Sequence, residues 1–461
     1  RSYSVTGVQT CALPISRIQQ WGQGLKSIIN GEPPQTMFDF SESIKNYNVP
    51  VVGHEIGQWC VYPDFKEIEK YTGTLKPTNF EIFRETLEKN NMGEQAEDFL
   101  MASGKLQALC YKADIEAALR TPGYAGFEML QLHDFPGQGT ALVGILNPFF
   151  ESKGYITPEE FRMFCNETVP LARMEKMILR NGETFEARVE IAHFGQAPLR
   201  NVKIPCRLTD HNGKIVREEI MSMQELGIGN NIVGIFAMET GGFSEAQKLK
   251  FEVSVAGTGF RNQWDLWVYP ESGKTDPGEI YITDNLDRNA EEILKKGGSV
   301  LLLAYGRVGK AKGADVAIGF SSIFWNTAWT RNQPPHTLGI LCDPDHPVFN
   351  GFPTEYHTNW QWWDPVTHSQ TMILDDFPVE LKPLIQPIDT WFENRRLALA
   401  FESLTGGGKI LVCSIDMGNL PDDRPVSRQL LGSVINYMKS KNFNPAVDLG
   451  LNQLRELLIE N

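Results

Sequence analysis

A carboxylate with polar and aromatic neighbours follows an apolar run near the start of the chain. Residues 49–52 (VPVV) are apolar, and the next seven are Gly53-His54-Glu55-Ile56-Gly57-Gln58-Trp59. In a β/α barrel the carboxyl ends of the strands form the active-site face, so Glu55 is placed for catalysis. His54, Gln58 and Trp59 supply the hydrogen bonds and the flat apolar surface that a sugar ring needs. The alternative is that Glu55 caps the following helix or forms a salt bridge at the barrel rim.

A second apolar run, residues 127–132, ends in polar side chains before a glycine-rich loop. Gln131, His133 and Asp134 lie at this end, and Glu128 lies within the run, where it could point into a barrel. Glycine lets the backbone approach a ligand closely, so we expect Gln131, His133 and Asp134 to bind substrate. Asp134 could orient the substrate or act on Glu55. The alternative is a turn in which Asp134 is a local cap.

Helical segments separate these two runs. Residues 78–89 have helical periodicity, with Phe80, Phe83 and Leu87 on one face and Thr78 as a candidate N-cap, and residues 96–119 continue with helix-forming residues. A strand, a long helical excursion and a second strand are typical of a β/α unit in a parallel sheet or barrel.

Residues 174–270 change period. Phe185, Ala187, Val189 and Ile191 alternate with charged residues, and residues 251–255 alternate in the same way. This period of two predicts half-buried antiparallel strands, and about a hundred residues of short strands predict a β-sandwich of immunoglobulin type.

A linker, residues 271–278, leads to a third region, residues 279–461. Strands are expected at 279–283, 300–304 and 409–415, and helices are expected at residues 289–296 and 426–439. Strands alternating with helices predict an α/β domain with a mostly parallel sheet.

Six of the ten tryptophans fall in this third region, among amide, acidic and arginine side chains. Exposed indoles with such neighbours would form a platform for carbohydrate. The alternative is packing in the core or at a domain interface, because tryptophan is usually buried. The six residues are Trp325, Trp329, Trp360, Trp362, Trp363 and Trp391.

Composition narrows the function classes. A chain of 461 residues predicts several domains. A net charge of −14 without a dense run of Lys and Arg argues against a nucleic-acid or anionic-membrane partner. No apolar run is long enough to span a membrane. The seven cysteines are scattered without zinc spacing, so we expect buried free thiols and no metal site. The oligomeric state has no signal in the sequence.

The first residues have a different origin from the rest. Residues 5–15, VTGVQTCALPI, resemble the translated sequence of a common sequencing adapter. Residues 1–16 are therefore expected to be a non-native tail, to be left out of fold reasoning, and the native protein to extend further at its N-terminus.

Residues 50–62 (PVVGHEIGQWCVY) and 66–73 (KEIEKYTG) resemble the end of the catalytic domain of bacterial glycoside hydrolase family 2 enzymes. The resemblance is closest to the sugar-binding-domain proteins of Bacteroidetes-type polysaccharide degraders. Residues 133–154 and the order of a sandwich before an α/β domain match the same group. The resemblance covers nearly all of residues 17–438.

The resemblance implies a fold and a set of roles. Residues 17–173 would be the C-terminal part of a (β/α)8 TIM barrel, with Glu55 as nucleophile at the end of the seventh strand and residues 127–134 as the eighth. The family's acid/base Glu follows an Asn on the fourth strand, upstream of this chain; Asn166-Glu167 lies too late to match. Ile56 departs from the family's aromatic residue at that position, which leaves the substrate preference open. The third region resembles glutamine-amidotransferase-like domains, but Cys342 and Cys413 lack flanking glycines, which implies a non-catalytic domain.

The implied chemistry is retaining glycoside hydrolysis, without metal or cofactor, on side chains of plant or algal polysaccharide. A β-galactosidase-like activity is the default expectation, and the parent protein is expected to be periplasmic or extracellular. This chain by itself is expected to be inactive, because it holds only the nucleophile. A rival interpretation is a non-catalytic carbohydrate-binding protein that uses the tryptophan-rich domain; another is a purely structural role for the sandwich and the α/β domain.

Overall fold

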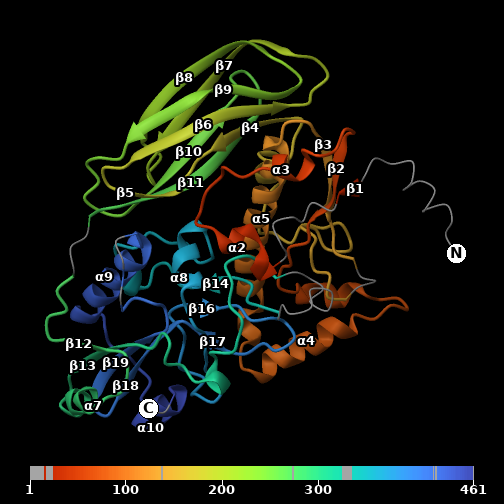
Figure 1. The fold of residues 1–461 in the computed structure, drawn as a ribbon. Helices are drawn as coiled ribbons and strands as arrows, with labels where there is room; N and C mark the ends of the chain where they lie inside the picture. Colours follow the sequence, from red (N-terminus) through yellow and green to blue (C-terminus); the bar gives the residue numbers. More distant parts are fainter. Residues whose placement is uncertain are drawn as a thin grey trace.

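The structure is a computed structural model that describes residues 15–16, 24–135, 139–271, 275–323, 335–418, 420 and 423–459. It is a mixed α/β protein with several separate sheets. Figure 1 shows an N-terminal α/β part in red and orange, a β-sandwich in yellow and green, and a C-terminal α/β part in teal and blue.

The N-terminal part contains a three-stranded sheet in the order β1-β2-β3, and both pairings are parallel. The strands are β1 (Ile15–Ser16), β2 (Val51–Gly57) and β3 (Tyr124–Leu130). The two strands predicted from the apolar runs are therefore neighbours, and their carboxyl ends lie at the same edge of the sheet. The helical elements of this part are η1 (Gly24–Lys26), α2 (Ile28–Gly31), α3 (Ser41–Ile44), η2 (Phe65–Lys70), α4 (Thr78–Lys89), η3 (Gly93–Gln95), α5 (Ala96–Arg120) and α6 (Pro158–Arg162).

Strand β1 lies inside the segment that the sequence marks as a non-native tail. Ile15 and Ser16 pair with Val52 and Gly53 of β2. An open strand edge offers unpaired N–H and C=O groups to any extended segment, so the pairing needs no specific side chains. In the structure these two residues thus pair with the sheet, although the sequence assigns them to a non-native tail.

Helices α4 and α5 connect β2 to β3. In α4 the residues Phe80, Phe83 and Leu87 are buried on one face, as the periodicity predicts, but Pro77 and not Thr78 occupies the N-cap position. Helix α5 is buried along most of its length and contacts β2, β3, β4 (Thr168–Arg173), β6 (Thr184–His193) and β14 (Ile340–Leu341). Figure 1 shows α5 running from the sandwich into the rest of the molecule, so one helix supports all three parts.

The central region folds as two antiparallel-dominated sheets packed face to face. The alternation predicted for residues 185–191 is confirmed, because Phe185, Ala187, Val189 and Ile191 are buried on the inner face. A hairpin turn joins β7 (Leu199–Thr209) to β8 (Ile215–Leu226), and in it Gly213 N–H donates to Asp210 O over 2.9 Å. One sheet has the order β4-β6-β9 and the other β5-β11-β10-β7-β8. The strands are β4 (Thr168–Arg173), β5 (Ile178–Arg180), β6 (Thr184–His193), β7 (Leu199–Thr209), β8 (Ile215–Leu226), β9 (Gly229–Glu239), β10 (Gln247–Ser254) and β11 (Arg261–Tyr269).

The sandwich begins earlier than the sequence boundary at residue 174. Strand β4 (Thr168–Arg173) pairs antiparallel with β6 along its whole length. Residues 168–173 therefore belong to the sandwich and not to the preceding part. The local sequence TVPLAR is uniformly buried, so it lacks the alternation that marks the other strands.

The C-terminal part is built on a four-stranded sheet in the order β12-β13-β19-β18. The first three strands are parallel and β18 is antiparallel to β19, so the prediction of a mostly parallel sheet is confirmed. Its elements are β12 (Tyr281–Thr283), α7 (Arg288–Lys295), β13 (Ser299–Leu303), η4 (Lys310–Lys312), β14 (Ile340–Leu341), η5 (Pro347–Phe349), η6 (Trp360–Trp362), α8 (Trp363–Thr367), β15 (Met372–Ile373), β16 (Gln386–Pro387), β17 (Leu397–Ala398), β18 (Ala400–Thr405), β19 (Gly408–Cys413), α9 (Pro425–Lys439) and α10 (Leu451–Leu457).

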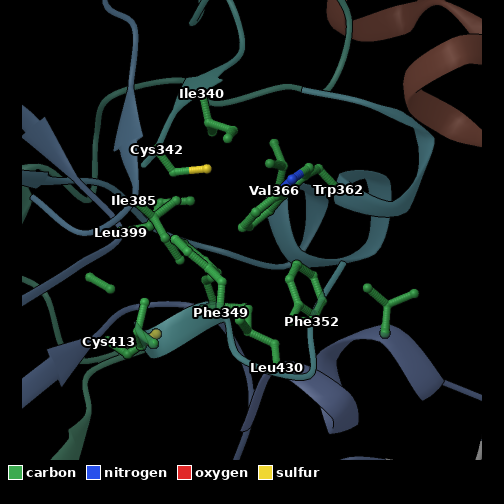
Figure 2. Close-up of a cluster of buried hydrophobic side chains, with 14 of the residues drawn as sticks. Ile340, Cys342, Phe349, Phe352, Trp362, Val366, Ile385, Leu399, Cys413 and Leu430 are labelled. Carbon is green, nitrogen blue, oxygen red and sulfur yellow. The ribbon is translucent and has the colours of Figure 1, made fainter. Parts of the chain in front are cut away.

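One hydrophobic cluster spans all three parts, in addition to the separate core of the sandwich. A single cluster joins Trp59 and Tyr111 of the N-terminal part, Trp267 and Tyr269 of β11, and a large set from the C-terminal part. Figure 2 shows the C-terminal portion of this cluster, in which Trp362 lies among Ile340, Cys342, Val366, Ile385 and Leu399. This shared core opposes independent movement of the parts.

The sequence also makes predictions about the cysteines and about membrane-spanning segments, which can be compared with the structure. The six described cysteines are free, and all but Cys165 are buried. Among the helices of the described residues, none is both long and apolar enough to cross a membrane.

Candidate functional site

Glu55 lies in β2, next to an irregularity in the pairing with β3. The register shifts between Gly53 and Ile56, so His54 and Glu55 form a bulge. Such bulges re-aim side chains next to functional sites. Glu55 has a φ of 57° and Gln58 has a φ of 61°. Both values lie in the left-handed region, which residues other than glycine rarely adopt. Two strained residues this close together, on either side of Gly57, indicate a site held by its surroundings.

Both carboxylate oxygens of Glu55 have neighbours that orient the side chain. His54 Nε2 lies 3.3 Å from Glu55 Oε1, and Gln58 Nε2 donates to Glu55 Oε2 over 3.4 Å. The other ring nitrogen of His54 lies 2.9 Å from Glu128 Oε2 on β3. The Glu55 side chain remains 26% exposed, so a solute can reach it. His54 thus bridges a partly exposed carboxylate on β2 and a more exposed one on β3.

Tyr111 of α5 ties the end of β3 to the loop that follows it. Its hydroxyl lies 2.9 Å from Leu130 O and 2.8 Å from Val143 O. Gln58 N–H donates to Leu130 O over 3.0 Å and continues the pairing beyond the end of β2. The structure therefore brings the two predicted segments to one sheet edge.

The residues after β3 divide into two groups. His133 is partly exposed and its ring stacks on Phe150, with centroids 4.4 Å apart. Gln131 is partly exposed as a residue, but its Nε2 is buried and, within the described part of the chain, has no hydrogen-bond partner. A buried donor without a partner is rare in folded proteins, and because this nitrogen is covered, a ligand can reach only the exposed part of the Gln131 side chain.

Asp134 does not face a substrate. It is 2% exposed, forms an ion pair with Lys153 Nζ at 2.6 Å, and accepts a hydrogen bond from Gly144 N–H at 2.8 Å. Burial raises the pKa of Asp134, and Lys153 opposes this shift. Its role is to hold the loop after β3, which corrects its assignment to substrate binding.

Trp59 and Gln58 are also buried, at 5% and 3% exposure. The Trp59 indole donates to Asp114 Oδ2 over 2.7 Å, inside the shared core. Burial raises the pKa of Asp114 to about 7, against the effect of that hydrogen bond. Trp59 therefore anchors β2 to α5 and offers no flat face to a sugar. Gln58 is buried beside Glu55 and orients its carboxylate through the side-chain hydrogen bond.

The six tryptophans of the third region do not form one platform. Trp362 and Trp391 are fully buried; Trp362 packs in the core of Figure 2, and Trp391 packs against Phe83 of α4. For these two residues the structure agrees with the alternative interpretation, packing in the core. Trp360 and Trp363 are partly exposed, and Trp325 and Trp329 lie outside the described residues.

Two buried charged residues near the site are absent from the sequence expectations. Lys153 pairs with Asp134, and Glu67 in η2 is completely buried. Glu67 lies in the segment KEIEK, whose composition is typical of a solvated surface, so no local signal marks it. In the part of the chain that the structure describes, no group of three or more His, Cys, Asp or Glu side chains could hold a metal ion.

Two family models match parts of the chain. Domain of unknown function (DUF8488) matches residues 183–270, and Domain of unknown function (DUF8487) matches residues 281–459. These ranges follow the sandwich and the C-terminal part. No curated protein matches the chain.

Several solved glycoside hydrolases show a weak structural likeness to the chain. A β-D-mannosidase from Dictyoglomus thermophilum is 16% identical with a TM-score of 0.32, covering 50% of this chain and 28% of that one. An exo-chitosanase from Amycolatopsis orientalis is 12% identical with a TM-score of 0.25, covering 42% and 22%. A β-glucuronidase from Parabacteroides merdae is 11% identical with a TM-score of 0.18, covering 30% and 22%. The chain thus spans about a quarter of the length of these proteins.

Proposed function

We propose that this chain is part of a retaining exo-glycosidase that hydrolyses O-glycosidic bonds of polysaccharide or oligosaccharide side chains, with Glu55 as its nucleophile. The observation that carries the proposal is the placement of Glu55: a partly exposed carboxylate on a strained bulge of a parallel strand, oriented by His54 and Gln58. In this proposal β2 and β3 are the last strands of a (β/α)8 barrel. The sandwich is of immunoglobulin type and the C-terminal part is a non-catalytic, amidotransferase-like domain.

The geometry of Glu55 suits nucleophilic attack. One carboxylate oxygen attacks the anomeric carbon while a second carboxyl group, roughly 5–5.5 Å away, protonates the leaving oxygen. Water then hydrolyses the glycosyl-enzyme, with the second group acting as base. The proposal assigns that acid/base to upstream sequence of an exported parent protein and expects this chain alone to be inactive. The proposal also includes a β-galactosidase-like substrate preference.

His54 has a positioning role in this proposal. Its ring contacts Glu55 on one side and Glu128 on the other, so it fixes the position of the Glu55 carboxylate relative to β3. The side chains of His133 and Gln131, both partly exposed, lie at the neighbouring strand end and would contact sugar hydroxyls.

Trapping of the covalent intermediate tests the nucleophile. The parent protein, expressed from the recovered upstream coding sequence, is incubated with 2-deoxy-2-fluoro-β-galactosyl, -mannosyl and -glucosyl fluorides and digested for mass spectrometry. We expect one glycosylated peptide, labelled at Glu55. Glu55→Gln should abolish labelling and hydrolysis of an aryl glycoside, whereas Glu42→Gln, an exposed carboxylate outside the sheet, should change neither.

Label on another carboxylate would overturn the role of Glu55. Hydrolysis of an aryl glycoside by the 461-residue chain alone would overturn the expectation that the chain is inactive. A start codon close to residue 17, without further barrel strands, would favour the second candidate function.

That second candidate is a non-catalytic carbohydrate-binding protein that uses the tryptophan-rich C-terminal part. The partial exposure of Trp360 and Trp363 favours it, because buried tryptophans such as Trp362 cannot contact a ligand. Binding of carbohydrate without any labelling of Glu55 in the parent protein would support this function over the first.

A further inference from the structure

A cavity lies where all three parts of the molecule meet. It has a volume of about 580 Å³, within the range of small-molecule sites. Pro33 and Pro34 line it from the N-terminal part, Ile178 lines it from β5 of the sandwich, and Trp363 and Arg424 line it from the C-terminal part. In Figure 1 the helices α8 and α9 beside this cavity lie well apart from β2, so the cavity is separate from Glu55.

Two tryptophans with fixed rings line this cavity. Trp363 donates its indole N–H to Asn30 O over 3.1 Å. Trp360 stacks on Phe320, with ring centroids 5.2 Å apart and an interplanar angle of 26°. Because these contacts hold the rings in place before any ligand arrives, little side-chain entropy is lost on binding.

The polar side of the cavity is organised around Asp364. Its carboxylate accepts hydrogen bonds from Arg424 Nε at 2.7 Å and from Ser427 Oγ at 2.5 Å, and it lies 3.1 Å from His368 Nδ1. Burial acts to raise the pKa of Asp364, but the bonds from His368, Ser427 and Arg424 hold it below its ordinary value. An ionised Asp364 fixes the orientation of Arg424 and His368. Ser427 bonds to Asp364 and not to His368, so this is not the arrangement of a Ser-His-Asp triad.

Arg424 and Lys176, which line the cavity, are already paired with carboxylates. Arg424 binds both Asp364 and Asp416, the latter at 3.0 Å, and Lys176 binds Glu183 at 2.9 Å. An anionic ligand would therefore find no unpaired positive charge among these groups, and the carboxylates of Glu175 and Asp423 would repel it. A neutral ligand with many hydroxyls meets no such penalty and can use donors and acceptors of both kinds.

We infer that this cavity binds a neutral saccharide, with an apolar ring face against Trp363 and Trp360 and hydroxyls against Arg424 and His368. Aromatic faces and fixed polar groups together are what such a ligand requires. The inference names the site that the second candidate function needs, and it holds equally if the chain is a glycosidase, because Glu55 takes no part in it.

Saturation-transfer NMR on the 461-residue chain tests the inference. The probes are the neutral tetrasaccharides galactotetraose, mannotetraose and xylotetraose, with trigalacturonate as the anionic counterpart. We expect saturation transfer to at least one neutral probe and none to trigalacturonate. Trp363→Ala should weaken that binding by about tenfold or more, since it removes a stacking face.

Two further variants make the test independent of folding. His368→Ala removes a partly exposed hydrogen-bonding ring and should also weaken binding, while Glu42→Gln, at an exposed carboxylate that does not line the cavity, should leave it unchanged. Binding that survives both cavity variants, binding lost in Glu42→Gln, tighter binding of trigalacturonate, or no transfer to any neutral probe would each overturn the inference. Failure of the Glu55 labelling experiment would leave it standing.

Discussion

Glu67 shows how a single buried carboxyl group can set a pH dependence. It is fully buried in η2, and within the described residues neither of its oxygens has a hydrogen-bond partner. Burial raises the pKa of Glu67 to about 8, although Lys153 acts in the opposite direction. Asp134 competes for the same lysine, with which it forms the buried ion pair behind the loop after β3.

We predict that Glu67 destabilises the fold as the pH rises. Between its ordinary pKa of 4.5 and its folded pKa of about 8, the unfolded chain loses the Glu67 proton while the folded chain keeps it. The contribution of Glu67 to stability is thus fully present below the lower pKa and is lost as the pH rises through the upper one. Each unit of pKa difference corresponds to about 1.4 kcal/mol, so the change reaches a few kcal/mol.

Urea unfolding followed across this pH range compares the wild type with Glu67→Gln. The variant should match the wild type at the acidic end and be more stable at the basic end. Glu69→Gln is the matched control, because Glu69 lies in the same helical turn but is exposed. Parallel pH profiles for wild type and Glu67→Gln would refute this account of Glu67.

At the scale of elements, Gly57 determines how β2 ends. Its φ of 95° lies in the left-handed region, and an added Cβ would come within 2.1 Å of Tyr111 Cε1. Tyr111 has no room to yield, because its hydroxyl is bound to both Leu130 O and Val143 O. Gly57 therefore allows the close approach of β2 and α5 that places Glu55.

Gly57→Ala should lower the free energy of unfolding by about 2–4 kcal/mol, from backbone strain together with overpacking. Chemical denaturation monitored by tryptophan fluorescence measures the change. Gly73→Ala is the control, because an added Cβ there meets nothing within 4 Å. Equal midpoints for the two variants would show that the contact with Tyr111 is not restrictive.

At the scale of the whole molecule, Glu116 of α5 links the N-terminal part to the sandwich. Its two oxygens accept hydrogen bonds from Asn262 Nδ2 at 2.7 Å and Trp264 Nε1 at 2.9 Å, both on β11. It also pairs with Lys112 and Arg120. Burial would raise the pKa of Glu116, but these two cations hold it below its ordinary value.

Glu116→Ala should cost about 3–5 kcal/mol, because it leaves buried cations without their partner. It should also uncouple α5 from the sandwich, so that calorimetry shows two unfolding transitions where the wild type shows one. Glu97→Ala, which removes an exposed partner of Lys66, should change stability by no more than about 1 kcal/mol. A single unshifted transition in Glu116→Ala would argue against this link.

Much of the fold follows from the sequence by itself, because its signals are local. The alternation at Phe185, Ala187, Val189 and Ile191 placed β6 correctly, and the spacing of Phe80, Phe83 and Leu87 placed the buried face of α4. Periodicity depends only on residues a few positions apart, so it can be recognised without knowing how the rest of the chain folds. The position of Glu55 in β2 was predictable for the same reason.

The tertiary structure decided which of these side chains can meet a ligand. Trp59 and Asp134 stand beside Glu55 and His133 in the sequence, yet Asp114 holds the first and Lys153 holds the second inside the protein. Trp362 and Trp363 are adjacent, but one is in the core and the other lines a cavity. Burial and ion pairing depend on elements that arrive from distant parts of the chain, and no local pattern records where those elements pack.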